Sequence, residues 1–179
     1  YAGQTCTAPE RVYLHEAIHD DFLEIFLELS RAVKVGNPED PATEMGPVAS
    51  ARAIGGIKAQ LEDAVARGAR IVLGGGIEGN LVFPTVVVDA SHDMLGMQKE
   101  TFGPVSFVCS FSTVEEVVRL ARDNRYGLRA AIYGDEDEAR KVGEKLVGES
   151  YPFEPGGRYA LASQCIGGGQ GIATVLEAL

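Results

Sequence analysis

Short apolar segments alternate with amphipathic helical segments along most of the chain, and this alternation restricts the folds that it can adopt. The apolar segments have the length of strands and occupy residues 11–14, 71–73, 83–88, 105–111 and 129–133. Segments this short and this apolar are typical of strands that are covered on both faces. We therefore predict an α/β fold, a layered domain with a largely parallel sheet flanked by helices.

Helical spacing and helix-start signals occur between these strands. The expected helices begin near Ile18, Ser50, Thr113 and Asp135. Ser50 has a side-chain oxygen suited to an N-cap, and Thr113 and Asp135 each stand three residues before a glutamate, as in a capping box. The first two helices each carry one apolar face, formed by Ile18, Phe22, Ile25, Phe26, Leu29 and Val33 in the first and by Ile54, Ile57, Leu61 and Val65 in the second.

Turn-forming residues separate these elements. We expect loops at 36–41 and at 93–99. The three glycines at 74–76 invite comparison with a phosphate-binding loop, but no Lys-Ser/Thr pair ends the run and no apolar helix follows it. We therefore interpret this run as a turn after the strand at 71–73.

The last part of the chain differs in character from the rest. Residues 151–157 contain two prolines and two glycines, as a linker does. Apolar segments at 159–162 and 172–176 bracket a glycine-rich run, and this pattern predicts a C-terminal β-hairpin. We accordingly divide the chain into residues 1–151, the α/β domain, and residues 152–179, a linker with the hairpin.

Charge and cysteine usage exclude several classes of protein. The formal net charge is −10 and the basic residues are scattered among carboxylates, so we expect neither nucleic-acid nor membrane partners. The three cysteines are far apart and lack a C-x-x-C pair, which argues against a disulfide framework and a zinc site. His15 and His19 straddle a strand-to-helix change, so we expect no metal site. A reduced, cytoplasmic compartment is the expected location.

Cys6 is the candidate for chemistry that stands out at the start of the chain. It follows Gly-Gln-Thr and precedes the strand at 11–14, so its thiol is expected on a polar turn. A thiolate displayed in this way is a plausible nucleophile. The alternative is a small buried apolar residue, which is the commoner role of a lone cysteine. Cys109 lies inside an apolar strand, and we interpret it as structural.

Three motifs in this order resemble the aldehyde dehydrogenase superfamily. The first is Gly3-Gln4-Thr5-Cys6 with Arg-Val-Tyr after it, and the second is the Glu-Thr-Phe-Gly-Pro run at 100–104. The third is Tyr-Gly-Leu at 126–128, followed by a strand. The resemblance covers residues 1–151 and implies the catalytic domain of that family. Residues 148–151 and the opening helix are most similar to its lactaldehyde/glycolaldehyde dehydrogenase branch.

The resemblance implies a role for three residues. Cys6 would be the nucleophile that adds to an aldehyde, forming first a thiohemiacetal and then a thioester. Glu100 would accept hydrogen bonds from ribose hydroxyls of NAD or NADP, and Phe102 would help to place the nicotinamide ring. Taken without the family, composition favours Glu100 as an exposed loop carboxylate with no ligand, and Phe102 could be a residue of the core.

The same resemblance also implies what this sequence lacks. In the family, a dinucleotide-binding domain, an oxyanion-hole asparagine and a general-base glutamate precede the nucleophile, and none of them precedes Tyr1 in this sequence. We therefore expect the isolated chain to be inactive or weakly active. We also expect self-association or a homo-oligomer, because domain surface would be exposed.

The C-terminal residues carry a second resemblance. Residues 157–171 look like the C-terminal hairpin of thiolases. Thiolase chemistry is excluded on this chain, because that family's Gly-His-Pro motif is missing and no histidine follows His92. Two alternatives to a dehydrogenase domain therefore stay open: a non-catalytic remnant or chimera, and a thiolase-related binding module.

Overall fold

The computed structural model describes residues 1–148, 159–166 and 170–177. These residues fall into two compact units, one of residues 1–113 and one of residues 114–179. None of the described helices is both long enough and apolar enough to cross a bilayer.

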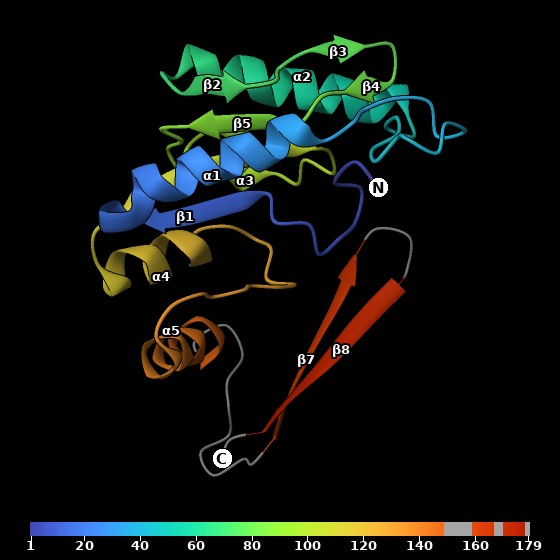
Figure 1. The fold of residues 1–179 in the computed structure, drawn as a ribbon. Coiled ribbons are helices and arrows are strands. Elements are labelled where there is room, and N and C mark those ends of the chain that lie inside the picture. The colour runs from blue at the N-terminus through green and yellow to red at the C-terminus, as the bar shows by residue number, and fades with distance from the viewer. Residues whose placement is uncertain (149–158, 167–169, 178–179) are drawn as a thin grey trace. The chain divides into compact units, whose positions relative to one another are not determined.

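The first unit is built on a four-stranded sheet with the order β1-β6-β5-β2, of which Figure 1 labels β1, β5 and β2. Strand β1 (Arg11–His15) runs parallel to β6 (Val105–Phe111), and β6 runs parallel to β5 (Thr85–Val88). Strand β2 (Arg70–Leu73) is antiparallel to β5 at the other side. The prediction of an α/β fold with a largely parallel sheet is thus confirmed.

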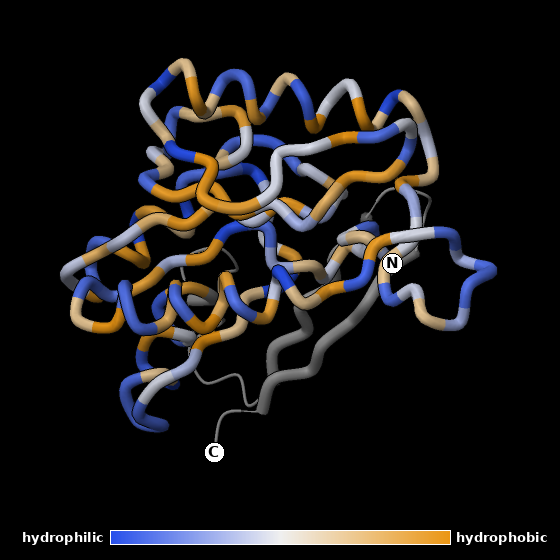
Figure 2. The backbone as a smooth tube through the Cα atoms, turned by 45° about the horizontal axis from the view of Figure 1, so that its top comes forward, coloured by the Kyte–Doolittle hydropathy of each residue, from blue (hydrophilic) through white to orange (hydrophobic). Residues whose placement is uncertain are grey.

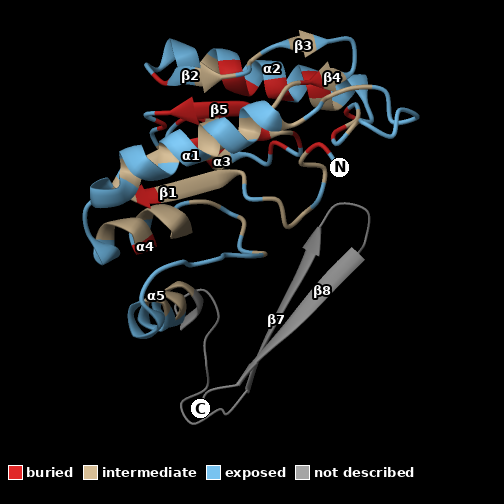
Figure 3. Cartoon of the chain, in the orientation of Figure 1, coloured by how far each residue is buried: buried red, intermediate tan, exposed pale blue. Residues whose placement is uncertain are grey.

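Helices cover both faces of this sheet, as the apolar strands predict. On one face, α2 (Ala51–Ala66) and α3 (Leu95–Gln98) enclose a core that contains Ile57, Met97 and Phe107. On the other face, α1 (His19–Ala32) follows the 3-10 turn η1 (Glu16–Ile18) and contributes residues to a second core. Every residue of β5 is buried (Figure 3), because its alternate side chains enter the two cores in turn.

The predicted helix starts and faces agree only in part with the structure. Ser50 caps α2, since its Oγ accepts a hydrogen bond from the Ala53 N–H at 3.2 Å. Polar and apolar residues both occur along α1 (Figure 2), but only part of the predicted face packs against the cores, including Phe26 and Val33. Leu23, Phe26 and Leu27 pack on the core, whereas Ile18, Phe22, Ile25 and Leu29 are exposed. Val65 of α2 is exposed as well.

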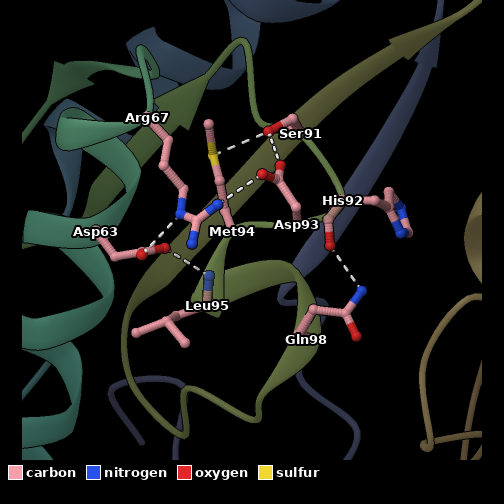
Figure 4. A network of polar contacts seen from close by, with 8 residues as sticks. All are labelled: Asp63, Arg67, Ser91, His92, Asp93, Met94, Leu95 and Gln98. Atoms are coloured by element: carbon pink, nitrogen blue, oxygen red, sulfur yellow. Dashed lines mark hydrogen bonds and ion pairs between the residues drawn. The ribbon is translucent and has the colours of Figure 1, made fainter.

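The segment 93–99 is not simply a loop, as the sequence had predicted, because residues 95–98 form α3. The Asp63 carboxylate of α2 accepts a hydrogen bond from the Leu95 N–H at 2.7 Å (Figure 4). Arg67 joins Asp63 to Asp93 through ion pairs of 2.8 and 2.6 Å. This helix therefore receives its N-terminal acceptor from a residue 32 positions earlier, which no local pattern reveals.

The glycine run at 74–76 ends β2, as expected, and continues as irregular backbone into a short hairpin that the sequence analysis missed. This hairpin pairs β3 (Ile77–Glu78) with β4 (Leu81–Val82) in antiparallel register. Gly74 has a φ of 73°, and a Cβ at this position would stand 2.1 Å from the Pro84 carbonyl oxygen. The close approach of two backbones, rather than a bound phosphate, accounts for this glycine.

The second unit contains α4 (Val114–Arg122) and α5 (Glu136–Gly148). Asp135 caps α5, because its Oδ1 accepts hydrogen bonds from the backbone N–H groups of Asp137 and Glu138 at 3.1 and 3.2 Å. The strand predicted at 129–133 is wrong, since these residues are exposed and form no strand. A strand needs a neighbouring strand for its hydrogen bonds, and within the described part of this unit only β7 and β8 pair with each other.

The predicted C-terminal hairpin is confirmed in its strands. Strand β7 (Tyr159–Ile166) pairs in antiparallel register with β8 (Gln170–Glu177), so that residue 159 lies opposite residue 177. The predicted linker at 151–157 and the centre of the glycine run lie outside the described residues.

Candidate active site

The candidate nucleophile Cys6 lies in a tight turn that side-chain and backbone hydrogen bonds hold in place. The Ala8 N–H donates to the Thr5 carbonyl at 2.9 Å and closes the turn around Cys6. Gln4 fixes the residues before it, because its Oε1 accepts from the Ala49 N–H at 2.8 Å and its Nε2 donates to the Tyr1 carbonyl at 3.0 Å. The Cys6 thiol is free and half-buried, as a nucleophile that admits substrate requires.

Gly3 brings this turn against the Gly-Pro part of the second motif. Its φ is 67°, a left-handed conformation that favours glycine. A Cβ added to Gly3 would stand 2.1 Å from the carbonyl oxygen of Gly103. Two segments about a hundred residues apart in the sequence therefore meet backbone to backbone, and the contact leaves no room for a side chain.

Glu10 makes the second connection between the two motifs. One of its carboxylate oxygens accepts the Thr101 N–H at 2.9 Å, and the other accepts the Phe102 N–H at 2.7 Å. Its own carbonyl accepts the Phe107 N–H at 2.8 Å, at the start of the pairing between β1 and β6. The loop at 100–102 is thus bound directly to the residues that follow Cys6.

Gln60 of α2 holds the same loop from the core side. This side chain is only 5% exposed, and its Nε2 donates to the Glu100 carbonyl at 3.0 Å. Its Oε1 accepts the Thr101 hydroxyl at 2.7 Å. Arg11 adds a bond from its Nε to the Met97 carbonyl at 2.8 Å. Because several buried or half-buried groups fix the loop, its conformation is set before any ligand arrives.

The hydrogen bonds to the loop at 100–102 hold Phe102 in an unusual backbone conformation. Its φ is 51°, which is uncommon for an aromatic residue and costs on the order of 1–3 kcal/mol. Its side chain is 37% exposed, so the alternative of plain core packing is wrong. An exposed ring in a strained backbone conformation is a common feature of ligand sites.

Glu100 is exposed as a residue, although its carboxyl group is partly buried. This burial raises the pKa of the carboxyl group, the neighbouring Glu10 carboxylate raises it further, and the Arg11 guanidinium opposes both. The carboxylate can accept hydrogen bonds through both oxygens, which suits a ligand that carries adjacent hydroxyl groups.

The structure therefore places the two motifs side by side, and a comparison with known sequences decides what they belong to. The sequence model described as the aldehyde dehydrogenase family matches residues 1–151. The chain belongs to this family. The resemblance seen in the sequence is confirmed.

Individual aldehyde dehydrogenases are similar to this chain in sequence and in structure. Succinate-semialdehyde dehydrogenase 1 of Schizosaccharomyces pombe, whose name specifies NADP(+), is 37% identical over 150 residues, which are 81% of this chain and 30% of the relative. Lactaldehyde dehydrogenase of Escherichia coli has a structure that matches with a TM-score of 0.77 at 38% identity, over 81% of this chain and 31% of that one. Betaine aldehyde dehydrogenase of Staphylococcus aureus, in complex with NAD+, matches with a TM-score of 0.76 at 35% identity, over 81% of this chain and 30% of that one.

The chain spans about a third of the length of these relatives. The residues matched by the family model, 1–151, include both motifs around Cys6 and Glu100. The third motif, Tyr126-Gly127-Leu128, lies in the second unit. Cys109 packs against the core of the first unit, which agrees with the structural role predicted for it.

The residues that join the motifs in this aldehyde dehydrogenase chain escaped the sequence analysis. Glu10, Arg11 and Gln60 all contact the loop at 97–102. Glu10 and Arg11 follow Cys6 by four and five residues. The sequence around this charged pair does not indicate which distant groups the two side chains bind. Gln60 could have been noticed as a polar residue on the apolar face of α2, one position before Leu61.

The described residues also form a cavity that lies away from this site. A cavity of about 310 Å³ is lined by the end of α1, the glycine run at 74–76 and residues 83–84, and none of the candidate site residues lines it. Among the described residues, no group of three or more histidine, cysteine, aspartate or glutamate side chains could hold a metal ion.

Proposed function

We propose that residues 1–151 form the nucleophile-bearing domain of an NAD(P)-dependent aldehyde dehydrogenase that oxidises an aldehyde to a carboxylic acid. The observation that carries this proposal is the double connection between the two motifs. Gly3 packs against Gly103, and Glu10 binds the amides of Thr101 and Phe102. A nucleophile and a cofactor-facing loop must be held together in this way, because hydride transfer requires both at one carbon atom.

The Cys6 thiolate would add to the aldehyde carbonyl carbon, so that a C–S bond forms and the carbonyl oxygen takes the negative charge. The Cys6 backbone N–H would donate a hydrogen bond to that oxygen. A bound NAD(P)+ would supply the acceptor for the hydride that leaves this carbon. The resulting thioester of Cys6 would then be hydrolysed by water, which releases the carboxylic acid and restores the thiol.

Glu100 and Phe102 would hold the cofactor. The Glu100 carboxylate would accept hydrogen bonds from ribose hydroxyls, and the exposed Phe102 ring would lie near the nicotinamide. Both residues fit such a ligand, since a carboxylate offers only acceptors and an exposed aromatic face suits a planar ring. The similar proteins named for NADP(+) or solved with NAD+ support either dinucleotide.

The proposal is tested by trapping the nucleophile. The chain is incubated with a short aldehyde and NAD(P)+, and peptides are then mapped by mass spectrometry for the acyl group, with NAD(P)H formation followed in parallel. Because the isolated chain is expected to be weakly active at best, we expect slow, single-turnover acylation at Cys6, its loss in Cys6→Ser and its retention in Cys109→Ser. A chain that neither acylates at Cys6 nor forms NAD(P)H would favour the alternative of a non-catalytic remnant.

We also propose that the chain associates with itself. The support is the stripe of Ile18, Phe22, Ile25 and Leu29, which follows one side of α1 and is exposed. Sedimentation velocity of the chain and of Ile25→Glu tests this. We expect the wild-type chain to form a larger species with increasing concentration and the variant to stay monomeric. A monomeric wild-type chain at high concentration would contradict the proposal.

A further inference from the structure

We infer that Glu10 is a positioning residue, whose carboxylate holds the Glu100–Phe102 loop in its cofactor-facing conformation and couples that loop to the segment that carries Cys6. The inference rests on the function proposed above, because it concerns the same loop. It adds a residue to which the family motifs themselves assign no role.

The first argument is the geometry of the contact. The two oxygens of Glu10 bind different backbone N–H groups, those of Thr101 at 2.9 Å and Phe102 at 2.7 Å. Two successive N–H groups that point at one anion form the kind of backbone concavity that binds anions in other proteins. Here the anion is supplied by the chain itself, from the segment between Cys6 and β1.

The second argument is the strain at Phe102. A left-handed φ of 51° is unfavourable for phenylalanine, so the free loop would prefer another conformation. The bond from the Phe102 N–H to Glu10 is made by the strained residue itself. Hydrogen bonds to an ionised acceptor are stronger than those between neutral groups, and this bond therefore offsets the strain.

The third argument is that the other contacts cannot replace Glu10. Gln60 binds the Glu100 carbonyl and the Thr101 hydroxyl, and Arg11 binds the Met97 and Lys99 carbonyls. These groups hold carbonyls and a side chain of the loop. Among the described residues, the two amides at 101 and 102 donate their hydrogen bonds to the carboxylate of Glu10.

The charge of Glu10 also reaches the proposed ligand-binding carboxylate. Glu10 and Arg11 both act on the Glu100 carboxyl group, whose pKa is raised first by burial and then by the Glu10 carboxylate. A neutral residue at position 10 would therefore release the loop and at the same time make Glu100 ionise more readily. This paired effect distinguishes Glu10 from a residue that merely stabilises the fold.

The variant Glu10→Gln tests the inference in the full chain. Glutamine has the same length, but its neutral amide offers one acceptor where the carboxylate offers two. Glu62→Gln is the matched control, since Glu62 is an exposed residue of α2 to which the described structure assigns no side-chain hydrogen bond. Circular dichroism establishes first that both variants are folded.

Amide exchange and carboxyl NMR titration are the first readouts. We expect the exchange protection of the Phe102 amide to fall about tenfold in Glu10→Gln, and the titration midpoint of Glu100 to move to lower pH. Glu62→Gln leaves both unchanged. Unaltered protection at residues 101 and 102 in Glu10→Gln would overturn the inference, whatever the catalytic result. If Glu10→Gln does not fold, Glu10→Asp replaces it, and the same loss of Phe102 protection is expected because the shorter side chain cannot reach both amides.

Dinucleotide binding is the second readout. We expect the dissociation constant for NAD(P)+ to rise about tenfold in Glu10→Gln, with no change in Glu62→Gln. Lost protection with unchanged dinucleotide affinity would overturn the positioning role. If the wild-type chain binds no dinucleotide and acylates nothing, the proposed function fails, while the amide exchange still decides whether Glu10 holds the loop.

Discussion

The backbone of Gly3 lies so close to that of Gly103 that a Cβ on Gly3 would stand 2.1 Å from the Gly103 carbonyl oxygen. This contact joins the turn of the candidate nucleophile to the loop of the candidate cofactor residues. It depends on the absence of a side chain, so it can be tested by adding a single methyl group.

We expect Gly3→Ala to lower the free energy of unfolding by about 2–4 kcal/mol, because the new Cβ must displace backbone and the left-handed φ disfavours alanine. Denaturant unfolding measures the change. Gly55→Ala is the control, since no atom lies within 4 Å of a Cβ at that helical position. We expect it to stabilise the chain by about 0.5–1 kcal/mol. Equal effects of the two substitutions would show that the packing of Gly3 against Gly103 is unimportant.

Selective labelling of the thiols provides a second prediction. Both Cys6 and Cys109 are half-buried, but Cys6 lies in a polar turn while Cys109 packs against the core, so we expect a small alkylating reagent to modify Cys6 faster. Mass spectrometry of the labelled peptides measures the two rates. Aldehyde added beforehand should protect Cys6 alone. Faster modification of Cys109 would contradict the assignment of Cys6 as the nucleophile.

The raised pKa of Glu100 leads to a third prediction. A carboxyl group whose pKa is higher in the folded than in the unfolded state destabilises the fold as pH rises through that range, because the unfolded chain ionises more readily. We therefore expect Glu100→Gln to be more stable than the wild-type chain at neutral pH, with the difference disappearing in acid. The same variant should bind NAD(P)+ more weakly. Thermal unfolding at several pH values and dinucleotide titration measure the two effects, and a loss of stability at neutral pH would contradict the first.

The contact between α2 and α3 leads to a fourth prediction, in which the loss of a carboxylate lowers stability at neutral pH instead of raising it. The hydrogen bond from the Leu95 N–H, and then that from Arg67, lower the pKa of Asp63 below its ordinary value of 3.8. Such a carboxylate stabilises the fold above that value, and its contribution is lost as pH falls through the lowered pKa. We expect Asp63→Asn to unfold more easily at neutral pH, with little difference from the wild-type chain in strong acid.

Thermal unfolding across this pH range measures the effect. Glu62→Gln, one residue earlier on the same helix, removes the same charge without touching α3 and should leave the pH dependence unchanged. A variant of Asp63 that keeps the wild-type stability at neutral pH would mean that α3 does not depend on this carboxylate.

Some of the errors in the sequence-based prediction have a common cause. The face of α1 was assigned from the spacing of its apolar residues, yet Leu23 and Leu27 pack on the core and Ile25 and Leu29 do not. Both sets have helical spacing, so periodicity alone cannot choose between them. The strand expected at 129–133 had the right composition, but a strand forms only where a partner accepts its hydrogen bonds.

The sequence by itself determined the α/β class, the order of most strands and helices, and the family, because apolar periodicity and short motifs are local properties of the chain. It also singled out Cys6, Glu100 and Phe102 through those motifs. Only the tertiary structure decided how they are supported. Glu10 and Gln60 reach their partners 91 and 40 residues away. Such contacts depend on which backbones the sheet brings together, and no local pattern carries that information.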